Sequence, residues 1–132
     1  LRDEAGNVKQ NVTVPNLVVN TGLAYIASRM KDTTLSAMSH MGVGSGTTNP
    51  AAGDTALETA LGARVALTST TVTANAIAYV ATFAAGSGTG AVTEAGIFNA
   101  LTSGTMLCRT EFAVINKGAS DSMTITWTVT IS

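Results

Sequence analysis

The sequence predicts a mainly β protein, an antiparallel β-sandwich or jelly roll with one short amphipathic helix. The most direct indication is the last stretch, residues 122–132, where apolar residues occupy every second position and Ser or Thr fills the others. Successive side chains of a strand point to opposite faces, so this stretch has one apolar face and one hydroxyl face. In addition, short apolar segments alternate with turn-forming clusters through most of the chain, which is typical of sandwiches.

Trp127 lies at the centre of that apolar face, between Ile125 and Val129. A large ring contributes most to a core when it is buried. We therefore expect the alternate apolar positions to be buried: Met123, Ile125, Trp127, Val129 and Ile131. The threonines between them are expected to face solvent or a partner subunit. We also expect this strand near the middle of its sheet.

With 132 residues the chain is most simply one β domain, 1–132. We divide it into an N-terminal hairpin or arm at 1–16, a helix at 20–32 and a β-sandwich body at 38–132. In the hairpin, the turn-forming cluster Asp3-Glu4-Ala5-Gly6-Asn7 separates Leu1-Arg2 from the alternating valines of residues 8–14.

The helix has a start signal, an apolar face and an end signal. Asn20 or Thr21 is the expected N-cap. Arg29 and Lys31 fall in the last turn, where positive charge complements the helix dipole. The apolar face expected against the sheet has the spacing i, i+3, i+4, i+7: Leu23, Ile26, Ala27 and Met30.

Strands are expected through the body, at 38–44, 64–73, 76–84, 92–99, 105–115 and the last stretch. The second and third of these form a hairpin across Ala74-Asn75, and the fourth and fifth form another. Loops rich in Gly, Ser and Thr are expected at 45–53 and 85–90. A single helical turn capped by Asp54 is expected between them, at 54–61.

Composition narrows the classes of function. Only 11% of residues are charged, against about a quarter in a typical soluble domain, and the net charge is −1 with no basic run. Nucleic-acid binding therefore lacks its electrostatic footprint. No apolar run is long enough to span a bilayer and no secretory signal is present, so we expect no membrane partner. A neutral, hydroxyl-rich surface suits a homo-oligomer, and we expect a trimer or a dimer.

No constellation of reactive residues emerges from the sequence. His40 is the only histidine and has no ligand set beside it, and the carboxylates are scattered through different elements. Cys108 is the lone cysteine, so no intrachain disulfide or cysteine-based zinc site can form. We therefore predict no catalytic residue, no cofactor and no metal site, and a protein that is not an enzyme.

The segment Thr93-Glu94-Ala95-Gly96-Ile97-Phe98 is unusual because a glutamate lies in an otherwise apolar strand. We interpret Glu94, Gly96 and Phe98 as structural residues. Gly96 is expected to allow a β-bulge or a close backbone contact. Glu94 is expected to accept hydrogen bonds from backbone donors or to pair with Arg64 or Arg109.

The same segment resembles the "TE-x-G-hydrophobic-F" signature of bacteriophage tail-fibre and other virion structural proteins. Other blocks resemble segments of the same proteins in a consistent order: Pro15-Asn-Leu-Val18 with Thr21-Gly22, Met41-Gly-Val-Gly-Ser-Gly-Thr-Thr48, Asp54-Thr-Ala-Leu57, Arg64-Val-Ala66 and Asn116-Lys-Gly-Ala-Ser-Asp121. The resemblance implies a virion component of a tailed phage, assembled in the cytoplasm of the bacterial host. It carries over no catalytic residue.

Two roles fit that resemblance, a capsid decoration (cement) protein and a tail-fibre or tail-attachment module. The chain shows no coiled-coil heptads and no repeated shaft units, so we expect decoration, with the major capsid protein or other virion proteins as partners. The N-terminal hairpin and the two Gly/Ser/Thr loops are the expected contacts. A small carbohydrate-binding domain is a distant third, because only 5% of residues are aromatic.

Overall fold

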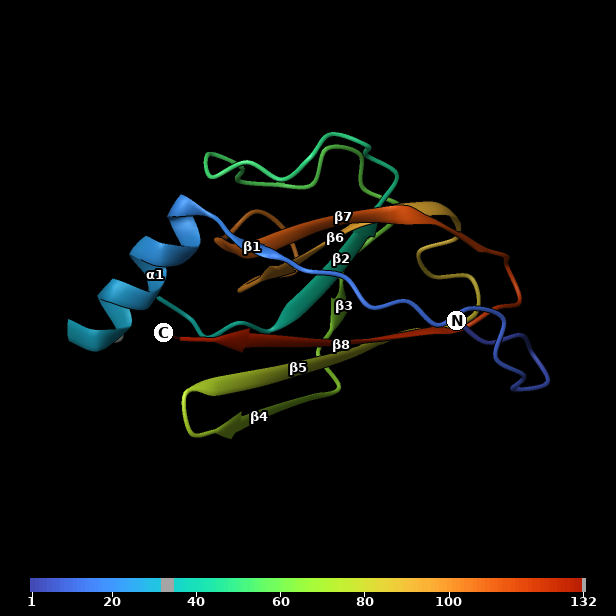
Figure 1. Ribbon diagram of the computed structural model, residues 1–132, viewed down its shortest axis with the longest axis horizontal. Coiled ribbons are helices and arrows are strands. Elements are labelled where there is room, and N and C mark those ends of the chain that lie inside the picture. The colour runs from blue at the N-terminus through green and yellow to red at the C-terminus, as the bar shows by residue number, and fades with distance from the viewer. Residues whose placement is uncertain (32–34, 132) are drawn as a thin grey trace.

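The computed structural model describes residues 1–31 and 35–131 and confirms the mainly β prediction. Its elements are β1 (Leu17–Val18), α1 (Asn20–Lys31), β2 (His40–Gly44), β3 (Val65–Ala66), β4 (Ser69–Thr73), β5 (Ala76–Phe83), β6 (Gly90–Phe98), β7 (Met106–Lys117) and β8 (Met123–Thr130). One antiparallel sheet has the order β1-β7-β6-β2-β3 and the other has the order β4-β5-β8. The two sheets lie one above the other and α1 lies at one end (Figure 1). The architecture is sandwich-like.

The main hydrophobic core lies between the two sheets. The five-stranded sheet contributes Met41, Val43, Val92, Ala95, Ile97 and Cys108, and the three-stranded sheet contributes Tyr79, Ala81, Phe83, Met123, Trp127 and Val129. Burial raises the pKa of the Cys108 thiol, which keeps it protonated and unreactive. Burial likewise raises the pKa of Tyr79 to about 12.

The five-stranded sheet is covered on its other face as well. Residues 92–98 of β6 are all buried, which a strand with one solvated face would not show. The cover is the connection between β2 and β3, residues 45–64, which we call the anchored loop. In Figure 1 it passes over β7, on the side away from the three-stranded sheet. A second, smaller cluster lies on this side, formed by Val19, Phe98 and Met106 with Leu57.

The last strand corrects two expectations. β8 lies at the edge of its sheet, and β5 takes the middle because it pairs with both β4 and β8. Met123, Trp127 and Val129 are buried as predicted, and Ile125 is half-buried. Ile131 is exposed, which contradicts the prediction. It lies beyond the end of β8, where its backbone N–H donates to the carbonyl oxygen of Asn75 in the β4–β5 turn.

The helix has the predicted extent, apart from residue 32, which lies outside the described residues. Its predicted apolar face is wrong. Gly22 and Tyr25 are the buried residues, whereas Leu23 and Met30 are exposed. The reason is Gly22: a Cβ there would overlap the carbonyl oxygen of Leu107 in β7. The helix therefore turns Gly22 toward the sheet, and of the predicted stripe only Ile26 packs against the core.

The N-terminal hairpin is reduced to one bridge, between Arg2 and Val8, and residues 9–16 form no strand. Val8, Val12 and Val14 are all exposed, and only Val8 takes part in a bridge. The arm is tied to the body by a second bridge from Arg2 to Ser122, by an ion pair from Lys9 Nζ to Asp121 Oδ2 at 2.6 Å, and by a hydrogen bond from the Thr110 hydroxyl to the carbonyl oxygen of Pro15 at 2.6 Å. Since the arm supplies no full strand, it does not extend either sheet.

Two further segments differ from the sequence prediction. The strand expected at 64–73 is divided into β3 and β4, which belong to different sheets. The helical turn expected at 54–61 does not form, and Asp54 instead accepts a hydrogen bond from the backbone N–H of Ala51. Both predicted hairpins, β4–β5 and β6–β7, are present.

Candidate functional site

The anchored loop is the feature of this fold that most needs explanation. Between Gly44 and Val65 the chain forms no helix and no strand, only an isolated bridge from Gly44 to Ala60. Irregular connections longer than about 12–15 residues are uncommon in compact domains and are usually functional. What holds this one in a single conformation is a cluster of buried polar groups centred on Glu94.

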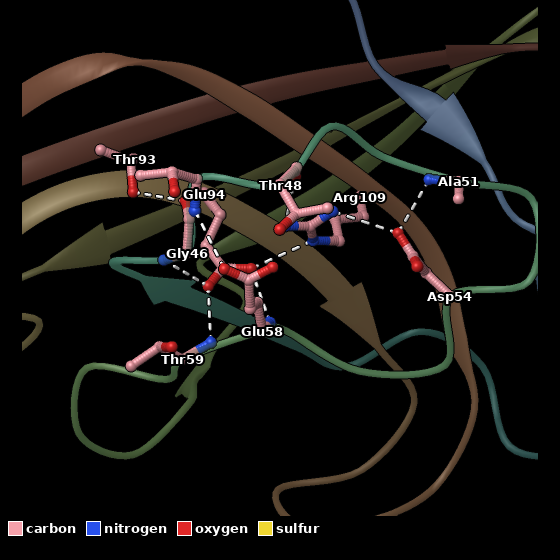
Figure 2. Close-up of polar contacts among 10 residues, drawn as sticks. Gly46, Thr48, Ala51, Asp54, Glu58, Thr59, Thr93, Glu94 and Arg109 are labelled. Atoms are coloured by element: carbon pink, nitrogen blue, oxygen red, sulfur yellow. Dashed lines mark hydrogen bonds and ion pairs between the residues drawn. The ribbon is translucent and has the colours of Figure 1, made fainter.

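Glu94 lies on β6 and is fully buried. Its Oε2 accepts hydrogen bonds from the backbone N–H groups of Gly46 and Thr59, each at 2.8 Å. Its Oε1 accepts one from the backbone N–H of Glu58 at 2.8 Å and one from Arg109 Nε at 3.0 Å. Figure 2 shows how these donors converge on the carboxylate. One side chain therefore joins both ends of the anchored loop to the sheet.

Arg109 extends the cluster from the neighbouring strand β7. Besides Glu94, its guanidinium donates from Nη1 to Asp54 Oδ2 at 3.1 Å and from Nη2 to the carbonyl oxygen of Thr48 at 3.0 Å. Its side chain is 2% exposed, so a charge of either sign left alone here would be costly. The pairing places the middle of the loop, at Thr48 and Asp54, over the same point of the sheet as its two ends.

Two glycines allow the backbone of the anchored loop to come this close to the Glu94 carboxylate. At Gly44, a Cβ would overlap the carbonyl oxygen of Thr59 and lie 2.6 Å from Glu94 Oε2. At Gly46, a Cβ would overlap Glu94 Oε2 and lie 2.5 Å from the Cβ of Glu58. Glycine is the residue that lets a backbone reach a ligand this closely. The glycines at positions 44 and 46 are thus explained by the close approach of the Glu94 carboxylate.

Smaller contacts complete the loop. The hydroxyl of Thr93 donates to the carbonyl oxygen of Gly46 at 2.6 Å, so both backbone groups of Gly46 bind β6. The Glu58 carboxylate accepts from the backbone N–H of Thr47, and hydrogen bonds from the Thr48 side chain and from Thr47 lower its pKa. The backbone N–H of Asn20 donates to the carbonyl oxygen of Ala52, which connects the loop to the start of α1.

This geometry leaves Glu94 without a free position for chemistry. An ionised carboxylate offers about four acceptor sites, and here each oxygen already has two donors in a site closed to solvent. The arrangement positions a loop. Within residues 1–31 and 35–131, no group of three or more His, Cys, Asp or Glu side chains is placed to hold a metal ion. No helix in the described part of the chain is long and apolar enough to cross a membrane.

Glu94, the centre of this cluster, was evident from the sequence, but most of its partners were not. Glu94 accepts backbone hydrogen bonds and pairs with Arg109, as one of the expected alternatives stated. Arg64 instead lies over the Phe98 ring, 3.5 Å from its centroid, and donates to carbonyl oxygens of the β6–β7 turn. Gly46 and Thr59 were not predicted as donors; the Gly spacing was the only signal that pointed to the first of them.

Gly96 has neither of the roles that were expected, a β-bulge or a close backbone contact. It pairs in regular register with Gly42 and Arg109, and the register shifts of β6 lie on either side of it. A Cβ at Gly96 would lie 3.1 Å from the Phe98 ring and 3.2 Å from a Leu57 methyl group. The glycine therefore makes room for side chains under the anchored loop. Trp127, Ile125 and Val129 lie on the other sheet and take no part in the cluster.

The fold and the cluster define a class, an antiparallel β-sandwich that carries a long loop fixed by buried charge. No family model, curated protein or solved structure matches the chain. The function must therefore be inferred from the residues themselves and from the motif resemblance.

Proposed function

We propose that this chain is a virion structural protein of a tailed bacteriophage, and more specifically a capsid decoration protein that bridges neighbouring subunits of the shell. The observation that carries the proposal is the ordered set of motifs that resembles phage virion proteins. The structure adds support because three of those motifs meet at one point. Gly46, Asp54 and Glu94 come from separate motif blocks, and all take part in fixing the anchored loop.

A rigid loop favours binding to the surface of another protein. Ordering a flexible segment on binding lowers affinity, so a loop that is already fixed by Glu94 and Arg109 binds more tightly. Residues 47–49 and 51–53 of the anchored loop are exposed. The buried cluster thus presents an uncharged surface segment in one conformation. This supports a contact surface over a catalytic one.

The sugar-binding alternative loses its support from the structure. Carbohydrate sites commonly stack the sugar on an exposed aromatic ring, and every aromatic side chain of this chain is buried: Tyr25, Tyr79, Phe83, Phe98, Phe112 and Trp127. A decoration protein does not need such rings. It needs a stable body and a surface that binds only the assembled shell, because binding to one state stabilises that state by mass action. Many copies acting in parallel make a small contribution per copy large for the particle.

The test compares phage particles that lack this protein with complete ones. We expect the deficient particles to release DNA at a lower temperature and to adsorb to host cells normally. Adding purified protein to them should restore heat resistance. A Glu94→Gln protein, whose loop is no longer fixed, should restore less heat resistance at the same concentration. Heads of unchanged stability together with failed adsorption would contradict the proposal and support the tail-fibre module.

A further inference from the structure

The three-stranded sheet has an edge that is open and carries no charge. β4 lies at that edge, and all five of its residues, Ser69–Thr73, are exposed. Among the described residues, no strand pairs with its outer side. Natural proteins usually protect such an edge with a charged residue, a proline or a bulge, since unpaired backbone groups are a template for another strand. None of the three strands of this sheet contains a charged residue or a proline.

The other sheet edges are less available. β1 and β3, at the edges of the five-stranded sheet, are two residues long. β8 has the N-terminal arm beside it, and the arm and β8 together line a cavity of about 470 Å³. In Figure 1, β4 lies at the periphery of the molecule, with the arm on the far side of β8. β4 is therefore the longest edge that nothing in the described chain approaches.

The register shows which backbone groups of β4 are free. A two-residue turn at Ala74-Asn75 makes Thr73 and Ala76 a hydrogen-bonded pair. Because bonded and non-bonded pairs alternate along an antiparallel ladder, Thr70 and Val72 direct their N–H and C=O groups away from β5. These two residues also turn their side chains toward the inner face, since they pair with Tyr79 and Ile77.

An apolar groove continues from this edge under the helix. Its volume is about 430 Å³ and it is lined by Tyr25, Met30, Val72, Ile77, Val129 and Ile131, among others. Val72 is 68% exposed and Met30 is 85% exposed, although both are apolar. The groove and the free backbone groups meet at Val72. One partner that adds a strand to β4 would therefore also cover apolar surface.

We propose that β4 pairs antiparallel with β4 of a second copy of this chain, so that two three-stranded sheets join into one across a two-fold axis at Thr71. Thr70 of each copy then exchanges both backbone hydrogen bonds with Val72 of the other. Thr71 faces Thr71 of the other copy as a non-bonded pair, whose side chains lie close together. The two grooves become neighbours across the junction.

A second copy fits this edge because the edge is self-complementary. When a short strand pairs with a second copy of itself across a two-fold axis, each residue faces itself or a near neighbour in the sequence. A charged residue at this edge would therefore face a like charge. The sequence Ser-Thr-Thr-Val-Thr brings hydroxyl groups and a β-branched apolar side chain together instead. This inference concerns the chain by itself and holds whether or not the protein binds a phage shell.

The first test is the oligomeric state of the purified chain by sedimentation. We expect a concentration-dependent dimer for the native sequence. Thr71→Lys should raise the dimer dissociation constant by tenfold or more, because two lysines then face each other across the axis. Thr128→Lys is the matched control: Thr128 is also exposed and on the outer face of the same sheet, but it lies on β8. It should leave the dimer unchanged, and unfolding curves should show that both variants stay folded.

The second test fixes the register. Cys108 is buried, so an introduced cysteine is the only accessible one. Thr71→Cys should form a reducible covalent dimer, since the Cα atoms of such a pair lie about 4.5 Å apart, within the range of a disulfide. Thr73→Cys should not, because residue 73 of the two copies would be roughly 14 Å apart.

Three results would overturn the proposal. The first is a native chain that stays monomeric up to its solubility limit. The second is a dimer that Thr128→Lys disrupts and Thr71→Lys does not. The third is a dimer in which Thr73→Cys is linked and Thr71→Cys is not.

Discussion

The five-stranded sheet buries a pair of oppositely charged side chains, whereas the Ser and Thr side chains of the three-stranded sheet are uncharged and exposed. Glu94 and Arg109 lie on β6 and β7 under the anchored loop. The threonines of β8 lie on an open face. The difference follows from what covers each sheet: one has a core on one face and a loop on the other, and the second has only the core. Buried charge needs partners fixed in space, while an exposed hydroxyl needs only water.

Polar groups have two different roles in the two sheets, to fix a loop in one and to leave a face free for contact in the other. A buried ion pair is weak evidence for net stability, because desolvation offsets much of the attraction, but removing one partner is costly. Here the pair determines the conformation of a long loop. The hydroxyl face adds little to folding and leaves the sheet free to meet another surface. The following predictions test this contrast, from the largest expected effect to the smallest.

The largest effect is expected in the core of the three-stranded sheet. Trp127→Ala should lower the free energy of unfolding by about 3–5 kcal/mol, the usual range for truncating a buried aromatic, because Trp127 is 4% exposed. Its neighbour Thr128 is exposed, so Thr128→Ala should change stability by less than about 0.5 kcal/mol. Denaturant unfolding measures both. A solvent-like fluorescence maximum for Trp127 in the folded protein would contradict its placement.

The next effect concerns the buried pair of the five-stranded sheet. Glu94→Gln should lower the free energy of unfolding by about 3 kcal/mol, the lower end of the range for leaving a buried charge alone, since the amide oxygen keeps some acceptor capacity. The loop should also become susceptible to proteolysis. Glu111→Gln is the control, because Glu111 lies opposite Glu94 on β7 and takes no part in the cluster. Equal losses for the two variants would show that the cluster has no special role.

A smaller effect is expected from a single methyl group at the anchored loop. Gly46→Ala should lower stability by about 1–3 kcal/mol, as overpacking does, because its Cβ would overlap the Glu94 carboxylate. Gly53→Ala is the control within the same loop, since a Cβ there has no atom within 4 Å. Thermal unfolding of the two variants measures the difference. A Gly46→Ala protein as stable as Gly53→Ala would show that the loop is not held close to Glu94.

The smallest effect is expected at the pair that ties the N-terminal arm to the turn before β8. The hydrogen bond from Lys9 and then that from the backbone N–H of Gly118 lower the pKa of Asp121 below its usual 3.8. Since the folded pKa is the lower one, this contribution is fully present above the unfolded pKa and is lost as the pH falls through the folded value.

Stability measured from pH 5 down to pH 2 should therefore fall more steeply for the native chain than for Asp121→Asn. Asp121→Asn should also expose the arm to proteases at neutral pH. Identical pH profiles for the two proteins would show that the Lys9–Asp121 pair does not hold the arm in place.

The sequence by itself determined the features that depend on neighbours along the chain. The alternation in residues 122–132 predicted β8 and its buried face, and turn-forming residues predicted the β4–β5 and β6–β7 hairpins. The start signal at Asn20-Thr21 and the last-turn charges predicted the extent of α1, although Thr21 uses its hydroxyl to donate to the carbonyl oxygen of Met106 and does not cap the helix. These signals are local because side-chain direction repeats every two residues in a strand and every 3.6 residues in a helix.

Only the tertiary structure decided the rest. Glu94 was an evident anomaly in its strand, but its partners Gly46 and Thr59 lie 48 and 35 residues away along the chain. Gly22 of α1 faces the sheet because the backbone of β7 comes too close for a side chain at that position. The spacing of apolar residues along the helix cannot predict how closely another strand will approach it. β8 is an edge strand because it pairs only with β5, which takes the middle position between β8 and β4. Periodicity specifies which face of an element is apolar, but the element that meets that face is determined only when the whole chain packs.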